Sequence, residues 1–138
     1  MTENEFIQRY TSHLSAQQKQ AVTATEGAVL LLAVPGSGKT TVLITRLGYM
    51  IYCRGIAPSE ILAVTYTRAA TFELKKRFSA FFGSEYAGSL EIRTINGLSS
   101  KIIERYGSVH GAESIPKLMS REGDRKRLIS DIYKDITG

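Results

Sequence analysis

The sequence is poor in residues that stabilise small extracellular or metal-dependent domains. Its 138 residues include no tryptophan, two histidines and a single cysteine. Because Cys53 is the single cysteine, the chain cannot form an internal disulfide. One cysteine and two histidines are also too few for a structural zinc site. The expected setting is the reducing cytoplasm.

Long apolar segments are also missing. The longest apolar run, residues 28–34, is far shorter than the roughly 20 residues that span a bilayer. The first five residues include two glutamates and no basic residue, and no long apolar region follows, so we expect neither a secretory signal nor contact with a membrane. A formal net charge of +5 suits a polyanionic partner without identifying one.

Short apolar runs alternate with helical patterns along most of the chain. The runs at 28–34, 61–66 and 90–94 are predicted strands, and the first is predicted to be a central strand buried on both faces. Because strands and helices alternate, the predicted fold class is α/β, with a parallel sheet and crossover helices.

Four helices are predicted by apolar spacing and by the residues at their ends, at 16–25, 39–53, 69–82 and 98–106. Ser15 is the expected N-terminal cap of the first helix, and Gly107 is expected to end the last. The third helix supplies three expected core residues, Phe72, Leu74 and Phe78.

The pattern changes after the last of these helices. Residues 107–119 hold two glycines and one proline, which predicts a connector. Residues 121–136 place Leu128, Ile129, Ile132 and Tyr133 on one side of an amphipathic helix. We therefore expect one domain over 1–107 and the interrupted beginning of a second over 108–138.

Residues 33–40, Ala-Val-Pro-Gly-Ser-Gly-Lys-Thr, match the phosphate-loop pattern except that Ala33 replaces its first glycine. Gly36 and Gly38 permit the tight turn that aims successive N–H groups at phosphates. The following helix N-terminus adds a partial positive charge. The alternative is an accidental glycine-rich turn, which the strand before it and the helix behind it disfavour.

The last two residues of this loop carry its chemistry. Lys39 is expected to reach the β- and γ-phosphates of a nucleotide, and the Thr40 hydroxyl to bind Mg²⁺. Phosphate loops serve kinases, transporters, GTPases and motor ATPases, so the loop alone does not define the use of the nucleotide.

Two further stretches carry residues suited to ligands. The Gln18 amide matches the N6 and N7 edge of adenine, although its segment, 14–22, also fits an ordinary polar helix. The second predicted strand leads to Tyr66 and Arg68, at the sheet edge where α/β proteins bind ligands. Tyr66 could stack on a base and Arg68 could contact phosphate; alternatively, one is a core aromatic and the other a solvated charge.

Together these stretches resemble the N-terminal end of the UvrD/Rep/PcrA-like superfamily 1 DNA helicases. Four segments resemble, in order, the Q motif and motifs I, Ia and Ib of that family: 14–22, 33–40, 65–74 and 93–98. An alanine at the position of Ala33 is usual in this motif I. Residues 120–124 are similar to the opening of the inserted subdomain called 1B.

The resemblance implies a P-loop NTPase fold: a partial RecA-like parallel sheet with flanking helices (subdomain 1A), followed by the start of 1B. It implies an ATP-dependent DNA helicase or translocase, a hydrolase of DNA repair, with ATP and Mg²⁺ as cofactors. The implied partners are single-stranded DNA, duplex junctions and the remaining helicase domains of the same chain.

The resemblance also implies particular site residues. Catalytic roles fall to Lys39 and Thr40, and Thr40 also ligates the metal. The implied ATP-binding residues are Gln18, Pro35, Gly36, Ser37, Gly38, Lys39, Thr40 and Thr41. The implied DNA-binding residues are Thr65, Tyr66, Thr67, Arg68, Thr94 and Asn96.

Hydrolysis in this family also needs a strand ending in Asp-Glu, the Walker B motif, and arginine fingers from a second RecA-like domain. No apolar run of the sequence ends in paired carboxylates, and Asp131 lies in a helical pattern. We therefore expect a fragment that binds ATP without its catalytic base. The alternative, a free-standing nucleotide switch or kinase-like protein, would need an acidic Mg²⁺ partner of its own.

Overall fold

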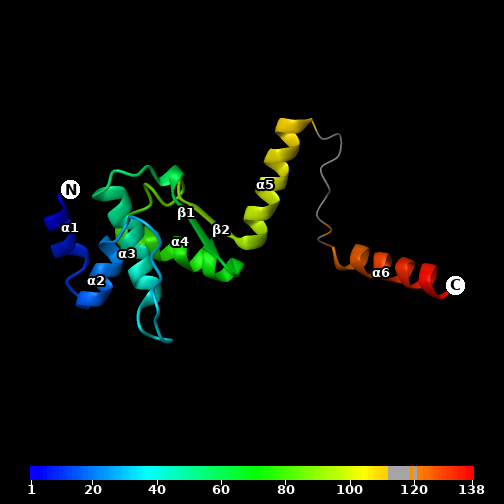
Figure 1. The fold of residues 1–138 in the computed structure, drawn as a ribbon, viewed down its shortest axis with the longest axis horizontal. Helices are drawn as coiled ribbons and strands as arrows, with labels where there is room; N and C mark the ends of the chain where they lie inside the picture. Colours follow the sequence, from blue (N-terminus) through cyan, green and yellow to red (C-terminus); the bar gives the residue numbers. More distant parts are fainter. Residues whose placement is uncertain (112–118, 120) are drawn as a thin grey trace. The chain divides into compact units, whose positions relative to one another are not determined.

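The computed structural model describes residues 1–111, 119 and 121–138, which divide into two units, Met1–Ser99 and Ser100–Gly138. The order of elements, followed from blue to red in Figure 1, is α1 (Glu3–Tyr10), α2 (Ala16–Thr23), α3 (Lys39–Tyr52), the 3₁₀ turn η1 (Pro58–Glu60), β1 (Leu62–Thr65), α4 (Arg68–Phe82), β2 (Glu91–Thr94), α5 (Ile95–His110) and α6 (Glu122–Thr137). The protein is thus a mixed α/β chain.

The sheet of the first unit has two parallel strands. Leu62 lies opposite Glu91, and Thr65 lies opposite Thr94, so the two strands end together at one edge. Helix α4 is the crossover between them. The predicted parallel arrangement is therefore confirmed for the runs at 61–66 and 90–94.

Reciprocal caps fix the first two helices. Ser15 accepts a hydrogen bond from the Gln18 N–H, and the Gln18 side chain accepts one from the Ser15 N–H, which confirms the predicted start of α2. Helix α1 was not predicted, although the same arrangement, between Thr2 and Glu5, begins it. The spacing Thr-x-x-Glu was the signal in the sequence.

Aromatic side chains from separate helices make the centre of the first unit. The rings of Phe6 (α1) and Phe82 (α4) are stacked with centroids 6.0 Å apart, and Phe6 is wholly buried. The hydroxyl of Tyr49 (α3) donates to Glu3 Oε1 at 2.7 Å. Burial, and then the hydrogen bond to Glu3, raise the pKa of the Tyr49 phenol. Helix α1 is therefore part of the core.

The predicted central strand at 28–34 is wrong. These residues have no regular secondary structure, and Leu30 and Leu32 are each 83% exposed. In Figure 1 the segment leaves the packed helices as the cyan loop between α2 and α3. A strand needs a neighbour for its backbone N–H and C=O groups, and β1 and β2 pair with each other. Within the described residues, 28–34 pairs with neither of these strands, so its backbone groups have no strand partner.

The prediction of one core residue is also wrong. Leu74 and Phe78 are buried as predicted, but Phe72 is 70% exposed. The helix turns about 100° per residue, which puts Phe72 roughly 200° from Leu74. The buried stripe of α4 continues instead to Phe82, where the helix ends as predicted, and Gly83 is its C-cap.

The predicted stop at Gly107 is wrong as well. Helix α5 continues through this residue to His110, and the next glycine, Gly111, has the positive φ of 64° that suits a helix end. A single glycine weakens a helix by about 1 kcal/mol, which is too little to end it.

The second unit contains the later part of α5 and helix α6. Helix α6 confirms the predicted helix at 121–136, and Leu128 and Ile132 on its apolar side are about half exposed. Residues 112–118 of the predicted connector, and Ser120 of the 1B-like segment, lie outside the described residues. Within the part that is described, no helix is both long and apolar enough to cross a membrane.

Candidate functional site

The loop between the run 28–34 and α3 turns on two glycines. Gly36 and Gly38 have φ values of 80° and 81°, a conformation that other residues adopt at a cost. Ser37 closes the turn, because its N–H and its hydroxyl both donate to the Val34 carbonyl, at 3.2 and 2.7 Å. Gly38 is the N-cap of α3, so the free N–H groups of the helix begin at the loop.

The Lys39 ammonium folds back over this loop. Its Nζ donates to the carbonyls of Ala33, at 3.1 Å, and Val34, at 2.8 Å. An ammonium carries three N–H donors, so one is left for an anion. The loop therefore brings a cation and a helix N-terminus to one place, which is the arrangement that binds phosphate.

Gln18 lies against the same loop. Its Nε2 donates to the Ser37 carbonyl at 2.9 Å, and its Oε1 accepts from the Ser15 N–H at 2.8 Å. A Cβ added to Gly38 would lie 3.3 Å from Gln18 Nε2. These two bonds use one N–H donor and one oxygen lone pair of the amide, so a second donor and a second lone pair are left for an adenine edge.

A cavity of about 350 Å³ lies beside the loop. Gln18, Ser37 and Lys39 line its polar side, and residues 31–34 line its apolar side. Of the other expected ATP ligands, Pro35 and Thr40 are exposed and Thr41 is half-buried at the start of α3. This donor set fits a nucleotide phosphate chain.

The described residues contain no group of three or more His, Cys, Asp or Glu side chains that could hold a metal ion. Mg²⁺ in nucleotide sites keeps few protein ligands and relies on the phosphates themselves. The exposed Thr40 hydroxyl, in the first turn of α3, is the protein group that fits this role.

A second set of predicted residues meets at the edge where β1 and β2 end. The Thr65 and Thr71 hydroxyls are 2.6 Å apart, which ties β1 to the first turn of α4. Thr67 caps α4 by accepting from the Ala70 N–H at 3.1 Å, and Thr94 accepts from the Gly97 N–H at 3.0 Å at the start of α5. Hydroxyls expected to contact DNA therefore also position two helix N-termini.

The remaining predicted DNA-binding residues are exposed. Tyr66 is 88% exposed, which excludes the alternative of a core aromatic. Arg68 and Asn96 are also exposed, in the first turns of α4 and α5. The sheet edge thus carries an accessible ring and a cation, which are the groups that bind a single nucleic-acid strand.

The same edge continues into a groove that sequence reasoning missed. It has a volume of about 320 Å³ and runs between α4 and β2. Phe72 and Lys75 line it together with Arg68 and Arg93. The signal in the sequence was the spacing of Arg68, Phe72 and Lys75, which share one helix face away from the buried stripe.

The parallel strands joined by a helix define the class of this chain: it is an α/β protein. Residues 14–137 match the UvrD/REP helicase N-terminal domain family. The chain belongs to this family.

The curated relatives are consistent with this assignment. The chain is 30% identical over 132 residues to the ATP-dependent DNA helicase PcrA of Leuconostoc citreum. This alignment covers 94% of this chain and 18% of the relative. It is 31% identical over 130 residues to the ATP-dependent DNA helicase UvrD1 of Mycobacterium leprae, covering 94% and 17%. It is 32% identical over 124 residues to the PcrA of Staphylococcus aureus strain Mu50, covering 90% and 17%. The chain thus spans less than a fifth of the length of these relatives.

Proposed function

We propose that this chain is the N-terminal ATP-binding part of an ATP-dependent DNA helicase or translocase. The whole protein would couple ATP hydrolysis to movement along single-stranded DNA and to duplex unwinding. Bound Mg·ATP would supply the γ-phosphate whose hydrolysis drives that movement. The loop at 33–40 would form part of a P-loop NTPase fold of the RecA-like type, in the cytoplasm.

The observation that carries this proposal is the Lys39 ammonium at the N-terminus of α3. Two carbonyls hold it over the turn that Gly36 and Gly38 form, so its charge is positioned before any nucleotide binds. Such preorganisation avoids the entropy of ordering a long side chain on binding. Gln18, bonded to Ser37, would hold the same loop beside the base.

The exposed sheet edge supports the second half of the proposal. Tyr66 would stack on a base of single-stranded DNA, and Arg68, Thr65, Thr67, Thr94 and Asn96 would line the path of the strand. Tyr66 lies just before α4 and Arg68 is its first residue. A displacement of that helix would therefore move the residues that contact the DNA strand. Coupling between the two sites would then pass through the packed helices.

The exposed run at 28–34 supports a further part of the proposal. Exposed apolar residues are unfavourable in water, and the backbone of this run, which pairs with no strand, can accept a neighbouring one. We expect residues outside this chain, including a Walker B strand, to cover the run in the longer protein. The carboxylates of that strand and arginine fingers would complete hydrolysis.

The test is ATPase activity of this chain compared with a longer protein that includes it. We expect negligible turnover by the 138 residues, with or without DNA, and DNA-stimulated turnover by the longer protein. Turnover of about 1 per second by the short chain, lost in Lys39→Ala, would favour the free-standing switch or kinase-like enzyme instead.

A further inference from the structure

Phe72 stands out from the other aromatic residues near the sheet edge. It is 70% exposed, although its helix buries Leu74, Phe78 and Phe82 on the other side. Exposing a phenylalanine leaves a large apolar surface in water. Phe72 lines the groove between α4 and β2, so this surface faces a space of about 320 Å³ that a ligand could fill.

Cations lie on both sides of this ring. Arg68 is one helical turn before Phe72 and Lys75 is one turn after it, so the two charges are about 10 Å apart along α4. In the described part of the chain, neither side chain has a hydrogen bond or an ion pair to another residue.

A third cation closes the groove from the sheet. Arg93 of β2 lines it and is bonded through Nε to Glu91, which fixes the position of its guanidinium. Among the described residues, no acidic side chain lines the groove. Its wall is therefore an aromatic ring with positive charges on several sides.

We infer that this groove binds single-stranded DNA, with one base stacked on Phe72 and a neighbouring phosphate on Lys75. The inference rests on the proposed function, because it extends the path of the strand from Tyr66 along the exposed face of α4. Stacking and charge act together here, because every base presents a face to a ring and every nucleotide carries a phosphate.

Charge and shape favour a nucleic-acid strand over an acidic peptide. A peptide of acidic residues alone would use the cations and leave the Phe72 ring in water, whereas a nucleotide brings both a phosphate and a base face. The groove also continues from Arg68, which opens α4 directly after the Tyr66 edge. One strand could therefore contact both positions.

The experiment measures the affinity of a labelled oligothymidylate by fluorescence anisotropy, in the whole protein that carries this sequence and without ATP. Phe72→Leu keeps an apolar side chain and removes the ring, so we expect affinity to fall roughly 5- to 150-fold, the range for losing one base stack. Phe72→Tyr keeps the ring and should bind as the parent does. Lys75→Gln should lower the slope of log Kd against log salt by about 0.7.

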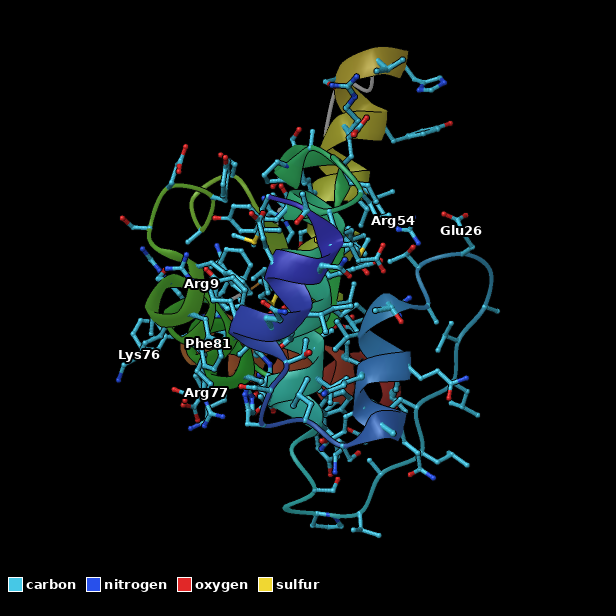
Figure 2. The ribbon with its side chains drawn as sticks, turned by 90° about the vertical axis from the view of Figure 1, so that its left-hand side faces the viewer. Arg9, Glu26, Arg54, Lys76, Arg77 and Phe81 are labelled. Atoms are coloured by element: carbon cyan, nitrogen blue, oxygen red, sulfur yellow. The ribbon has the colours of Figure 1, made fainter. Side chains whose placement is uncertain are left out.

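The matched controls lie on the same helix, outside the groove. Phe81 is 41% exposed, and the side chains of Lys76, Arg77 and Phe81 extend from one side of α4 in Figure 2. Phe81→Leu and Lys76→Gln should leave both the affinity and the salt slope unchanged. Melting temperatures of all variants are measured beside the affinities, and the exposure of Phe72 predicts no loss for Phe72→Leu.

The outcomes separate this inference from the proposed function. If Tyr66→Ala binds the oligothymidylate more weakly while Phe72→Leu and Lys75→Gln bind it as the parent does, the groove is not a DNA site. The helicase proposal would then stand. Parental binding by all three variants would overturn the proposed DNA path itself. An equal affinity for a polyglutamate peptide, insensitive to Phe72→Leu, would show an acidic-peptide site and reject the DNA groove.

Discussion

Two apolar runs of this chain have the same character and different structures. The run at 61–66 contains β1, where Ile61 and Ala63 are buried and the backbone pairs with β2. The run at 28–34 is more apolar, yet it is exposed and irregular. Each run nevertheless leads to a candidate functional side chain, Tyr66 in one case and Lys39 in the other.

The difference lies in the neighbours that each run finds. A strand is stable when its hydrogen-bonding edge and its apolar face are both covered. Residues 90–94 cover one edge of the first run, and α4 packs against it. The second run has no such partner among the described residues. Apolar composition therefore indicates where a strand can form, and pairing decides whether it does.

The largest expected effect sharpens this contrast within α4. Phe78→Ala removes a wholly buried ring, so the free energy of unfolding should fall by about 3–5 kcal/mol. Phe72→Ala, on the same helix, should change it by less than about 0.5 kcal/mol because the ring is exposed. Urea denaturation measures the free energy of unfolding of both variants and of the parent. Equal losses would mean that Phe72 is packed.

The next effect concerns the residue to which the unpaired run leads. Lys39→Ala removes charged hydrogen bonds to phosphate, so ATP affinity should fall by about 1.5–3 kcal/mol. Binding of single-stranded DNA without ATP should not change, because Lys39 belongs to the loop and not to the sheet edge. Calorimetric titration with ATP is the measurement, and Lys76→Ala is the control. An unchanged ATP affinity in Lys39→Ala would show that Lys39 does not bind the phosphates of ATP.

The corresponding change at the end of the paired run should act on the other ligand. Tyr66→Ala should weaken single-stranded DNA binding in the whole protein by about 1–3 kcal/mol and leave ATP affinity largely unchanged. Its melting temperature should stay near that of the parent, since the ring is 88% exposed. A large thermal loss with parental DNA binding would instead identify Tyr66 as a structural residue.

The smallest expected effect is that of a substitution at Leu32, which is compared with the same substitution in the paired run. In this chain Leu32→Ala should change the free energy of unfolding by less than about 0.5 kcal/mol, whereas Ile61→Ala should lower it by about 2–5 kcal/mol. In the longer protein, Leu32→Ala should become costly if a neighbouring strand covers the run. Equal effects in the two contexts would contradict the proposed strand.

The sequence predicted the elements whose stabilising contacts are local. Ser15 and Gln18 are three residues apart, and their mutual cap starts α2 as expected. The stripe of Leu74 and Phe78 likewise follows from the turn of one helix. Phe72 was misplaced because apolar character was counted without its angle around that helix. Helix α1 was missed although its Thr2–Glu5 cap was present.

The candidate site divides in the same way. The order of residues in 33–40 is enough to predict a turn at Gly36 and Gly38, since positive φ is a property of the residue and its immediate neighbours. The bond from Gln18 to Ser37 and the groove beside Phe72 join residues far apart in the chain. No local pattern specifies such contacts.

The sequence by itself determined the Ser15 cap of α2, the glycine turn, the parallel order of β1 and β2, and the family. These follow from hydrogen bonds and apolar spacing over a few residues, or from motifs in a fixed order. Only the tertiary structure decided that the run at 28–34 is exposed, that Tyr66 faces solvent, and that Gln18 holds the loop. Burial depends on which distant surfaces meet, and a residue's own chemistry does not contain that information.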